Sequence, residues 1–148
     1  TTWTPLVGSG RFYVPSNDFS IMISQAMFDD VFLPGIAAEC RFLDQSIYHL
    51  DGPGALRHLD SLLSIPELDA IQFVFGAGNE GFHRWVQVYQ RIQAAGKGIQ
   101  VNCDFDELPL IMETLQPRGL FLAMGQVPSG EAALQMLKEL ERWAARAG

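Results

Sequence analysis

The chain has 148 residues, of which 48% are hydrophobic and 18% are charged, so it is long and apolar enough to form a globular core. Its formal net charge is −7, and its 10 Lys and Arg residues form no basic stripe, which argues against a nucleic-acid-binding surface. No apolar run is long enough to span a membrane, and the 2 isolated cysteines fit a reducing compartment. We therefore expect one cytoplasmic domain, residues 1–148, that binds neither nucleic acid nor membrane.

Five short apolar segments recur along the chain, each followed by a polar or glycine-rich stretch and then by a helical pattern. They are residues 11–14, 46–49, 70–75, 99–102 and 119–124. Tyr13, Ile47, Ile71, Val101 and Phe121 mark these segments. No Asn-Gly hairpin signal joins neighbouring segments, and strands that alternate with helices are typical of a parallel sheet. The sequence therefore predicts an α/β fold of five strand–helix units.

Helix boundaries are indicated by individual residues. Ser24 and Ser129 are predicted N-caps, and Gly96 is a predicted C-cap. Pro34 falls inside a helical pattern, which it should kink or split. His58 is predicted to be a solvated or interfacial histidine and not a ligand.

Polar side chains follow the predicted strands, where parallel α/β proteins bind their ligands. The stretch S-I-Y-H-L-D-G-P-G, residues 46–54, ends in an imidazole, a carboxylate and two glycines whose backbone a ligand can approach. His49 is the candidate acid/base or metal ligand, and Asp51 would orient it or share the metal. The candidate catalytic residues are His49, Asp51 and Asp104. The candidate substrate-binding residues are Asn17, Asp18, Tyr48, Gly52, Asn79, Cys103 and Gln126.

Structural alternatives exist for the same residues. Asn17 and Asp18 also fit an Asx turn. Tyr48, His49 and Asp51 equally fit a strand end whose polar groups satisfy one another. We predict that His49, Asp51, Asp104 and Gln126 converge at one end of the sheet, because parallel strands end together there.

Three segments resemble the C-terminal half of uroporphyrinogen decarboxylase-like proteins. They are R-F-Y-V-P-S-N-D-F-S-I-M-I-S, S-I-Y-H-L-D-G-P-G-A-L-R-H-L-D and L-D-A-I-Q-F-V-F-G-A-G. The superfamily also contains the cobalamin- and corrinoid-dependent methyltransferases. The resemblance covers residues 6–143 and is most specific around residues 49–54. It implies a parallel-stranded half of a (β/α)8 barrel, since a whole barrel needs about 250 residues.

The methyltransferase branch of this superfamily has a His-x-Cys-Gly zinc motif and a second Cys at the end of the last strand, where zinc activates a thiol. This chain has His49-Leu50-Asp51-Gly52, with Asp in place of the first Cys, and Met124-Gly125-Gln126 at the second position. The resemblance implies methyl or carboxyl group transfer on a tetrapyrrole- or corrinoid-linked small molecule, by a decarboxylase-like lyase or a methyltransferase. Zinc is the candidate cofactor, with His49 and Asp51 as ligands.

The alternative is a non-catalytic small-molecule-binding or assembly module, which the missing zinc cysteines favour. A half-barrel has two open sheet edges and an inner face that needs cover. We therefore expect a homodimer or a complex with a complementary half-barrel chain, with Tyr13 and Phe121 near the interface.

Overall fold

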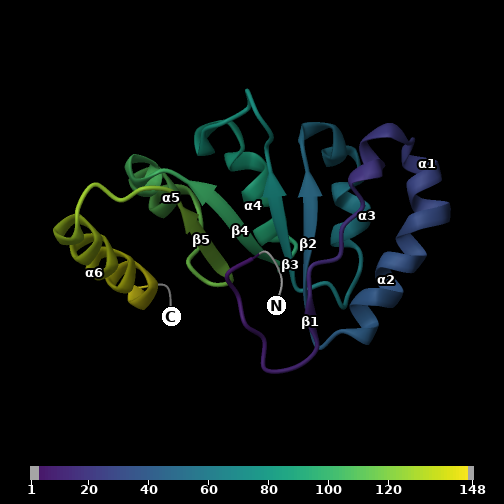
Figure 1. Cartoon of the computed structure of the whole chain (residues 1–148), viewed down its shortest axis with the longest axis horizontal. Helices are drawn as coiled ribbons and strands as arrows, with labels where there is room; N and C mark the ends of the chain where they lie inside the picture. The colour runs from purple at the N-terminus through teal and green to yellow at the C-terminus, as the bar shows by residue number, and fades with distance from the viewer. Residues whose placement is uncertain (1–3, 147–148) are drawn as a thin grey trace. The chain divides into compact units, whose positions relative to one another are not determined.

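The computed structural model describes residues 4–146, which divide between Gly76 and Ala77 into two compact units. Strands alternate with helices in each unit (Figure 1), and the strand pairs within each unit are parallel. The predicted α/β fold of five parallel strands alternating with helices is therefore confirmed. That the chain forms one domain stays a prediction. Between residues 4 and 146, no helix is both long enough and apolar enough to cross a membrane.

The strands of the first unit lie in the order β1-β2-β3. Their bounds are β1 (Phe12–Tyr13), β2 (Gln45–Asp51) and β3 (Ala70–Val74). β2 is longer than the predicted residues 46–49, so that Asp51 as well as His49 lies within the strand, and His49 is opposite Gln72 of β3. Beyond β1 the chain still runs beside β2, because the His49 amide donates to the Pro15 carbonyl over 2.9 Å.

β2 and β3 form much of the core of this unit. Ile47, Leu50, Ile71 and Phe73 are all buried, as near-continuous apolar runs predict for strands covered on both faces. Each such side chain contributes about 1.5–3 kcal/mol through the apolar surface that it removes from water.

Residues 4–76 of the first unit also contain six helical segments. They are η1 (Asp18–Met22), α1 (Gln25–Met27), the π-helical turn η2 (Phe28–Phe32), α2 (Leu33–Phe42), η3 (Pro53–His58) and α3 (Leu59–Leu63). The Ser24 hydroxyl accepts a hydrogen bond from the Met27 amide over 3.2 Å, which confirms the predicted N-cap. Pro34 lies in the first turn of α2 and cannot donate a backbone hydrogen bond. The helix is split before it by the wide turn η2, in which the Leu33 amide bonds to the Phe28 carbonyl.

His58 lies at the end of η3 and is fully buried, with 0% of its surface exposed. A solvated His58 was one of the two predicted possibilities, and it is wrong. The ring is instead interfacial, since it stacks on Phe28 of η2 at 4.2 Å between centroids. Helical periodicity could not indicate this burial, because the residue belongs to a 3-10 segment whose faces differ from those of an α-helix.

The second unit contains two parallel strands and the helices around them. Their bounds are η4 (Phe82–Arg84), α4 (Val86–Ala94), β4 (Gly98–Cys103), η5 (Phe105–Glu107), α5 (Leu108–Thr114), β5 (Leu120–Met124) and α6 (Gly130–Arg146). Gly96, with φ of 75°, ends α4, and the Ser129 hydroxyl accepts from the Ala132 amide at the start of α6. Both predicted caps are confirmed. In the core of this unit, Phe82 stacks on Tyr89 at 5.3 Å.

Candidate functional site

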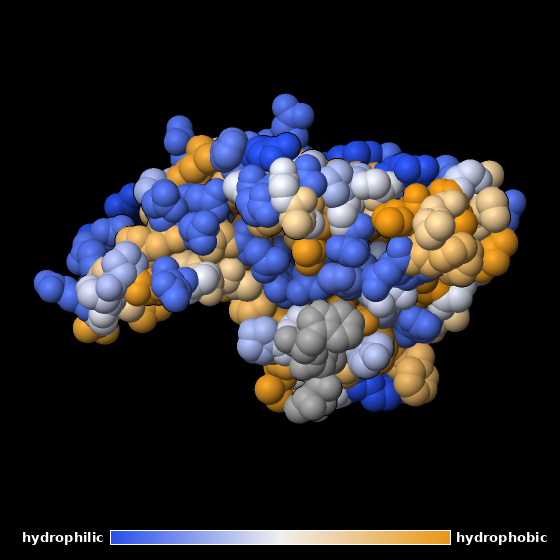
Figure 2. All heavy atoms as spheres, turned by 45° about the horizontal axis from the view of Figure 1, so that its top comes forward, coloured by the Kyte–Doolittle hydropathy of each residue, from blue (hydrophilic) through white to orange (hydrophobic). Residues whose placement is uncertain are grey.

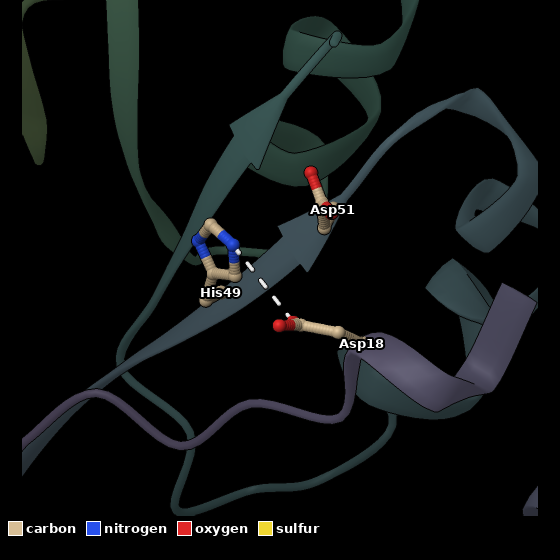
Figure 3. Close-up of side chains that lie close together, drawn as sticks. All are labelled: Asp18, His49 and Asp51. Carbon is tan, nitrogen blue, oxygen red and sulfur yellow. Dashed lines mark ion pairs between the residues drawn. The ribbon is translucent and has the colours of Figure 1, made fainter.

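The candidate site lies in the first unit, at the C-terminal end of β2. His49 and Asp51 project from this strand, and Asp18 reaches the same place from η1 (Figure 3). The segment that precedes Asp18 is held against β2 by the Pro15–His49 backbone hydrogen bond and by the bridge between Ser16 and His49. This backbone pairing brings a carboxylate 31 positions earlier in the sequence next to the imidazole.

His49 is positioned by a hydrogen bond that its ring donates to a residue of the neighbouring strand β3. Its Nδ1 atom lies 2.6 Å from Oε1 of Gln72, a side chain that is 5% exposed. An amide oxygen only accepts hydrogen bonds, so Nδ1 carries the proton. In the uncharged form of the ring the lone pair is then on Nε2, and this atom lies 4.0 Å from Oδ1 of Asp18.

Asp51 is the last residue of β2, and Gly52 follows it with φ of 77°. The Gly52 amide donates to the Val74 carbonyl over 2.7 Å, which fixes the turn after the strand. A residue with a side chain adopts this conformation at a cost, so glycine suits the position. The predicted role of Gly52 as a close backbone approach to a ligand stays a prediction.

One potential ligand atom from each of Asp18, His49 and Asp51 lies within 4.8 Å of the other two. Ligands of tetrahedral zinc are about 3.4 Å apart when the bonds are about 2.1 Å long. The Asp18 side chain is 67% exposed, so it can rotate to close this difference. One imidazole nitrogen and two carboxylate oxygens suit zinc, and three protein ligands leave a coordination position for a substrate. The residues present therefore fit the metal that the resemblance implies.

Two further predicted residues lie next to this cluster. Asn17 directly precedes η1, and its carbonyl accepts a hydrogen bond from the Ser20 amide over 2.9 Å. Tyr48 is 1% exposed, and burial together with the nearby Asp18 carboxylate raises the pKa of its phenol. Tyr48 is thus a neutral, buried group of β2.

The other predicted residues belong to the second unit. Asp104 forms a reciprocal capping box with Glu107, whose Oε2 atom accepts from the Asp104 amide over 3.0 Å. A Cβ atom added to Gly125 would lie 3.4 Å from Oδ1 of Asp104, so these two residues are close together. Gln126 directly follows Gly125 in the sequence. The convergence of Asp104 and Gln126 with His49 and Asp51 stays a prediction.

Cys103 ends β4 and is 7% exposed. Burial, reinforced by the Glu107 and Asp104 carboxylates, raises the pKa of its thiol to about 12. It is therefore a neutral thiol near pH 7 and a poor nucleophile or metal ligand there. Asn79 lies in the loop before η4, where its carbonyl accepts from the Trp85 indole over 2.8 Å.

Sequence reasoning missed the role of Gln72 and did not assign Asp18 to the metal ligands. Gln72 lies in the apolar stretch A-I-Q-F-V, where a buried polar residue in a strand was the available signal. Its partner could not be identified without the register of β2 and β3. Asp18 was predicted only to bind substrate, because the pairing of residues 15–16 with β2 leaves no mark in the local sequence.

Comparison of the chain with models of protein families, with curated protein sequences and with solved structures finds no match in any of the three.

Proposed function

We propose that this chain is a uroporphyrinogen decarboxylase-like protein that uses a divalent metal, zinc first, in methyl or carboxyl group transfer on a small tetrapyrrole- or corrinoid-linked molecule. Asp18, His49 and Asp51 would hold the metal at the end of β2. The resemblance of residues 11–24, 46–60 and 68–78 to that family motivates the substrate class.

The hydrogen bond between His49 and Gln72 is the observation that carries the metal site. A metal-binding histidine usually donates from one ring nitrogen to a fixed acceptor, which leaves the other nitrogen as a ligand. Nδ1 of His49 donates to Gln72, and Nε2 faces Asp18. Two carboxylates beside the imidazole also provide the negative charge that a dication needs.

Bound zinc supplies Lewis-acid chemistry, which stabilises a substrate thiolate or a developing oxyanion. Within this chain, His49 and Asp51 hold fixed positions on β2, whereas the exposed Asp18 adjusts to the ligand set. The hydrogen bond from the Gly52 amide to the Val74 carbonyl fixes the turn that follows Asp51. The residues would thus bind and orient the substrate next to a single open coordination position.

Zinc titration by isothermal calorimetry tests the metal site. Wild-type protein freed of metal by a chelator should bind one zinc ion per chain, and His49→Ala should abolish binding. His83→Ala removes an exposed histidine in the second unit and should leave binding unchanged. Absence of zinc binding by the wild type, or equal binding by both variants, would contradict the proposed site.

Ligand binding tests the substrate class separately. Cobalamin and a reduced porphyrinogen, each titrated into zinc-loaded wild-type protein, should bind, and Asp51→Asn should weaken that binding at least tenfold. Zinc binding without binding of either compound would keep the metal site but remove the proposed substrate class.

A non-catalytic binding or assembly module is the second candidate. It is favoured by Asp51, which stands where the methyltransferases have a zinc cysteine, so that the soft ligand set of that branch is lost. Protein that binds a corrinoid or porphyrinogen but neither takes up zinc nor turns over a methyl or carboxyl donor would support this function.

A further inference from the structure

The 3-10 segment η1, which carries Asp18 at its start, buries little apolar surface of its own. Phe19, Ile21 and Met22 are 55%, 47% and 74% exposed. Figure 2 shows apolar side chains gathered on the right of the view, the side on which Figure 1 shows α1 and α2 of the first unit. A segment with few buried apolar contacts unfolds locally at a low free-energy cost. Other contacts must therefore hold η1, and with it Asp18, in place.

A hydrogen bond from His58 provides such a contact. Nε2 of the fully buried ring lies 2.9 Å from the carbonyl oxygen of Ser20, in the middle of η1. Ser20 is itself only 2% exposed, in contrast to its neighbours in η1. A carbonyl oxygen only accepts, so Nε2 donates this hydrogen bond.

The other ring nitrogen also faces an acceptor, so this second contact is a hydrogen bond only in the ring form that carries a proton on both nitrogens. Nδ1 of His58 lies 3.1 Å from Oε1 of Gln25, whose Nε2 atom donates to Asp29 over 2.8 Å and to Ser61 over 2.7 Å. Because the Asp29 carboxylate only accepts, the amide of Gln25 must present its oxygen to the histidine. The ring is further fixed by its stacking on Phe28, with an interplanar angle of 19°.

His58 thereby joins η1, which carries Asp18, to the segment that follows Asp51. It ends η3, which begins two residues after Asp51, and it anchors η1, which begins at Asp18. Loss of the bond to Ser20 would free η1 while β2, with His49 and Asp51, stayed in the sheet.

We propose that His58 is a positioning residue of the metal site: its hydrogen bond to the Ser20 carbonyl holds η1, and with it the Asp18 carboxylate, opposite His49 and Asp51. This inference rests on the metal site proposed above.

A pair of matched substitutions tests it. In His58→Gln the amide nitrogen falls near the place of Nε2 and retains a donor for Ser20, whereas in His58→Asn it falls near Nδ1 and loses that donor. Both variants lose the ring stack, so they share that structural cost. His58→Asn should weaken zinc binding about tenfold or more, as loss of an orienting contact does, and His58→Gln should stay within about threefold of the wild type.

Two further measurements separate positioning from general stability. The double variant His58→Asn/Asp18→Asn should bind zinc no more weakly than Asp18→Asn alone, because both changes act through the same ligand. Without metal, amide hydrogen exchange at residues 20–23 should accelerate in His58→Asn but not in His58→Gln. If His58→Asn does not fold, His58→Phe, which keeps the stack on Phe28, takes its place.

Equal zinc affinity of the Asn and Gln variants, or additive effects of the two changes in the double variant, would overturn the positioning role while leaving the metal site intact. Failure of the wild type to bind zinc would overturn the metal site, and the positioning role with it.

Discussion

Nδ1 of His49 lies 2.6 Å from Oε1 of Gln72, the residue directly opposite it on β3. The bond joins neighbouring strands within the first unit and fixes which ring nitrogen carries the proton. A buried amide thus determines how an imidazole at the end of β2 presents its lone pair.

Removal of the Gln72 acceptor should therefore weaken metal binding. Gln72→Leu keeps the apolar bulk of the side chain but leaves Nδ1 without its acceptor, and we expect zinc affinity to fall about 10–100-fold. Gln72→Glu retains an acceptor in the same place and should bind zinc at least as tightly as the wild type. Calorimetric titration of both variants measures this, and equal affinities would show that Gln72 does not orient His49.

Asp51 should matter for zinc and little for folding. We expect Asp51→Ala to change the free energy of unfolding of the metal-free protein by less than about 1 kcal/mol, because a site residue has few structural partners. Zinc at about 100 times its dissociation constant should stabilise the wild type by about 2.7 kcal/mol and leave the variant unchanged. Urea unfolding with and without zinc provides both numbers. A loss above about 2 kcal/mol without metal would identify Asp51 as a buried structural partner.

Acid should weaken the contact between Arg11 and Asp44. Hydrogen bonds from Arg11 to the Asp44 carboxylate, at 2.9 Å for the shorter side-chain bond, lower its pKa to about 2. A lowered folded-state pKa adds stability above the ordinary value of about 4, and that stability is lost as the pH falls toward 2. The free energy of unfolding should thus fall less between pH 5 and pH 2 in Asp44→Asn than in the wild type. Parallel pH profiles of both proteins would contradict this.

Both cysteines should be unreactive in the folded protein. Cys40 and Cys103 are 1% and 7% exposed, and burial is the largest cause of the raised pKa of each thiol. An aromatic disulfide reagent at pH 8 should therefore modify neither residue in the native state and both in urea. Rapid native modification of Cys103 would show that its thiolate is accessible, as a ligand-binding role requires.

Assembly is predicted from the edge strand of the second unit. All five residues of β5 are partly exposed, and within the described part of this unit β5 pairs only with β4. An apolar strand edge favours pairing with another chain, so we expect a homodimer or a complementary partner chain at micromolar concentration. Phe121→Lys should weaken that association. Sedimentation equilibrium measures the molar mass in solution, and a 16.4 kDa monomer across the micromolar range would contradict the prediction.

Local sequence was sufficient for the strand–helix order. Apolar runs, the caps at Ser24, Ser129 and Gly96, and the break at Pro34 all act over a few residues, so their consequences are visible in a short window. The same signals also indicated that polar side chains would gather at the end of β2.

Tertiary structure alone decided which of those side chains meet. Asp18 reaches His49 through backbone pairing with β2, and Gln72 reaches it through the register of β2 and β3. His58, expected to be solvated or interfacial, is buried because η1 and η2 pack around it. Each contact joins residues that are more than 20 positions apart in the sequence. Such side chains come within contact distance only after the strands have paired, so a short sequence window cannot indicate the contact. A local sequence pattern therefore indicates where β2 ends. Which side chains meet there as candidate metal ligands depends on the folded structure.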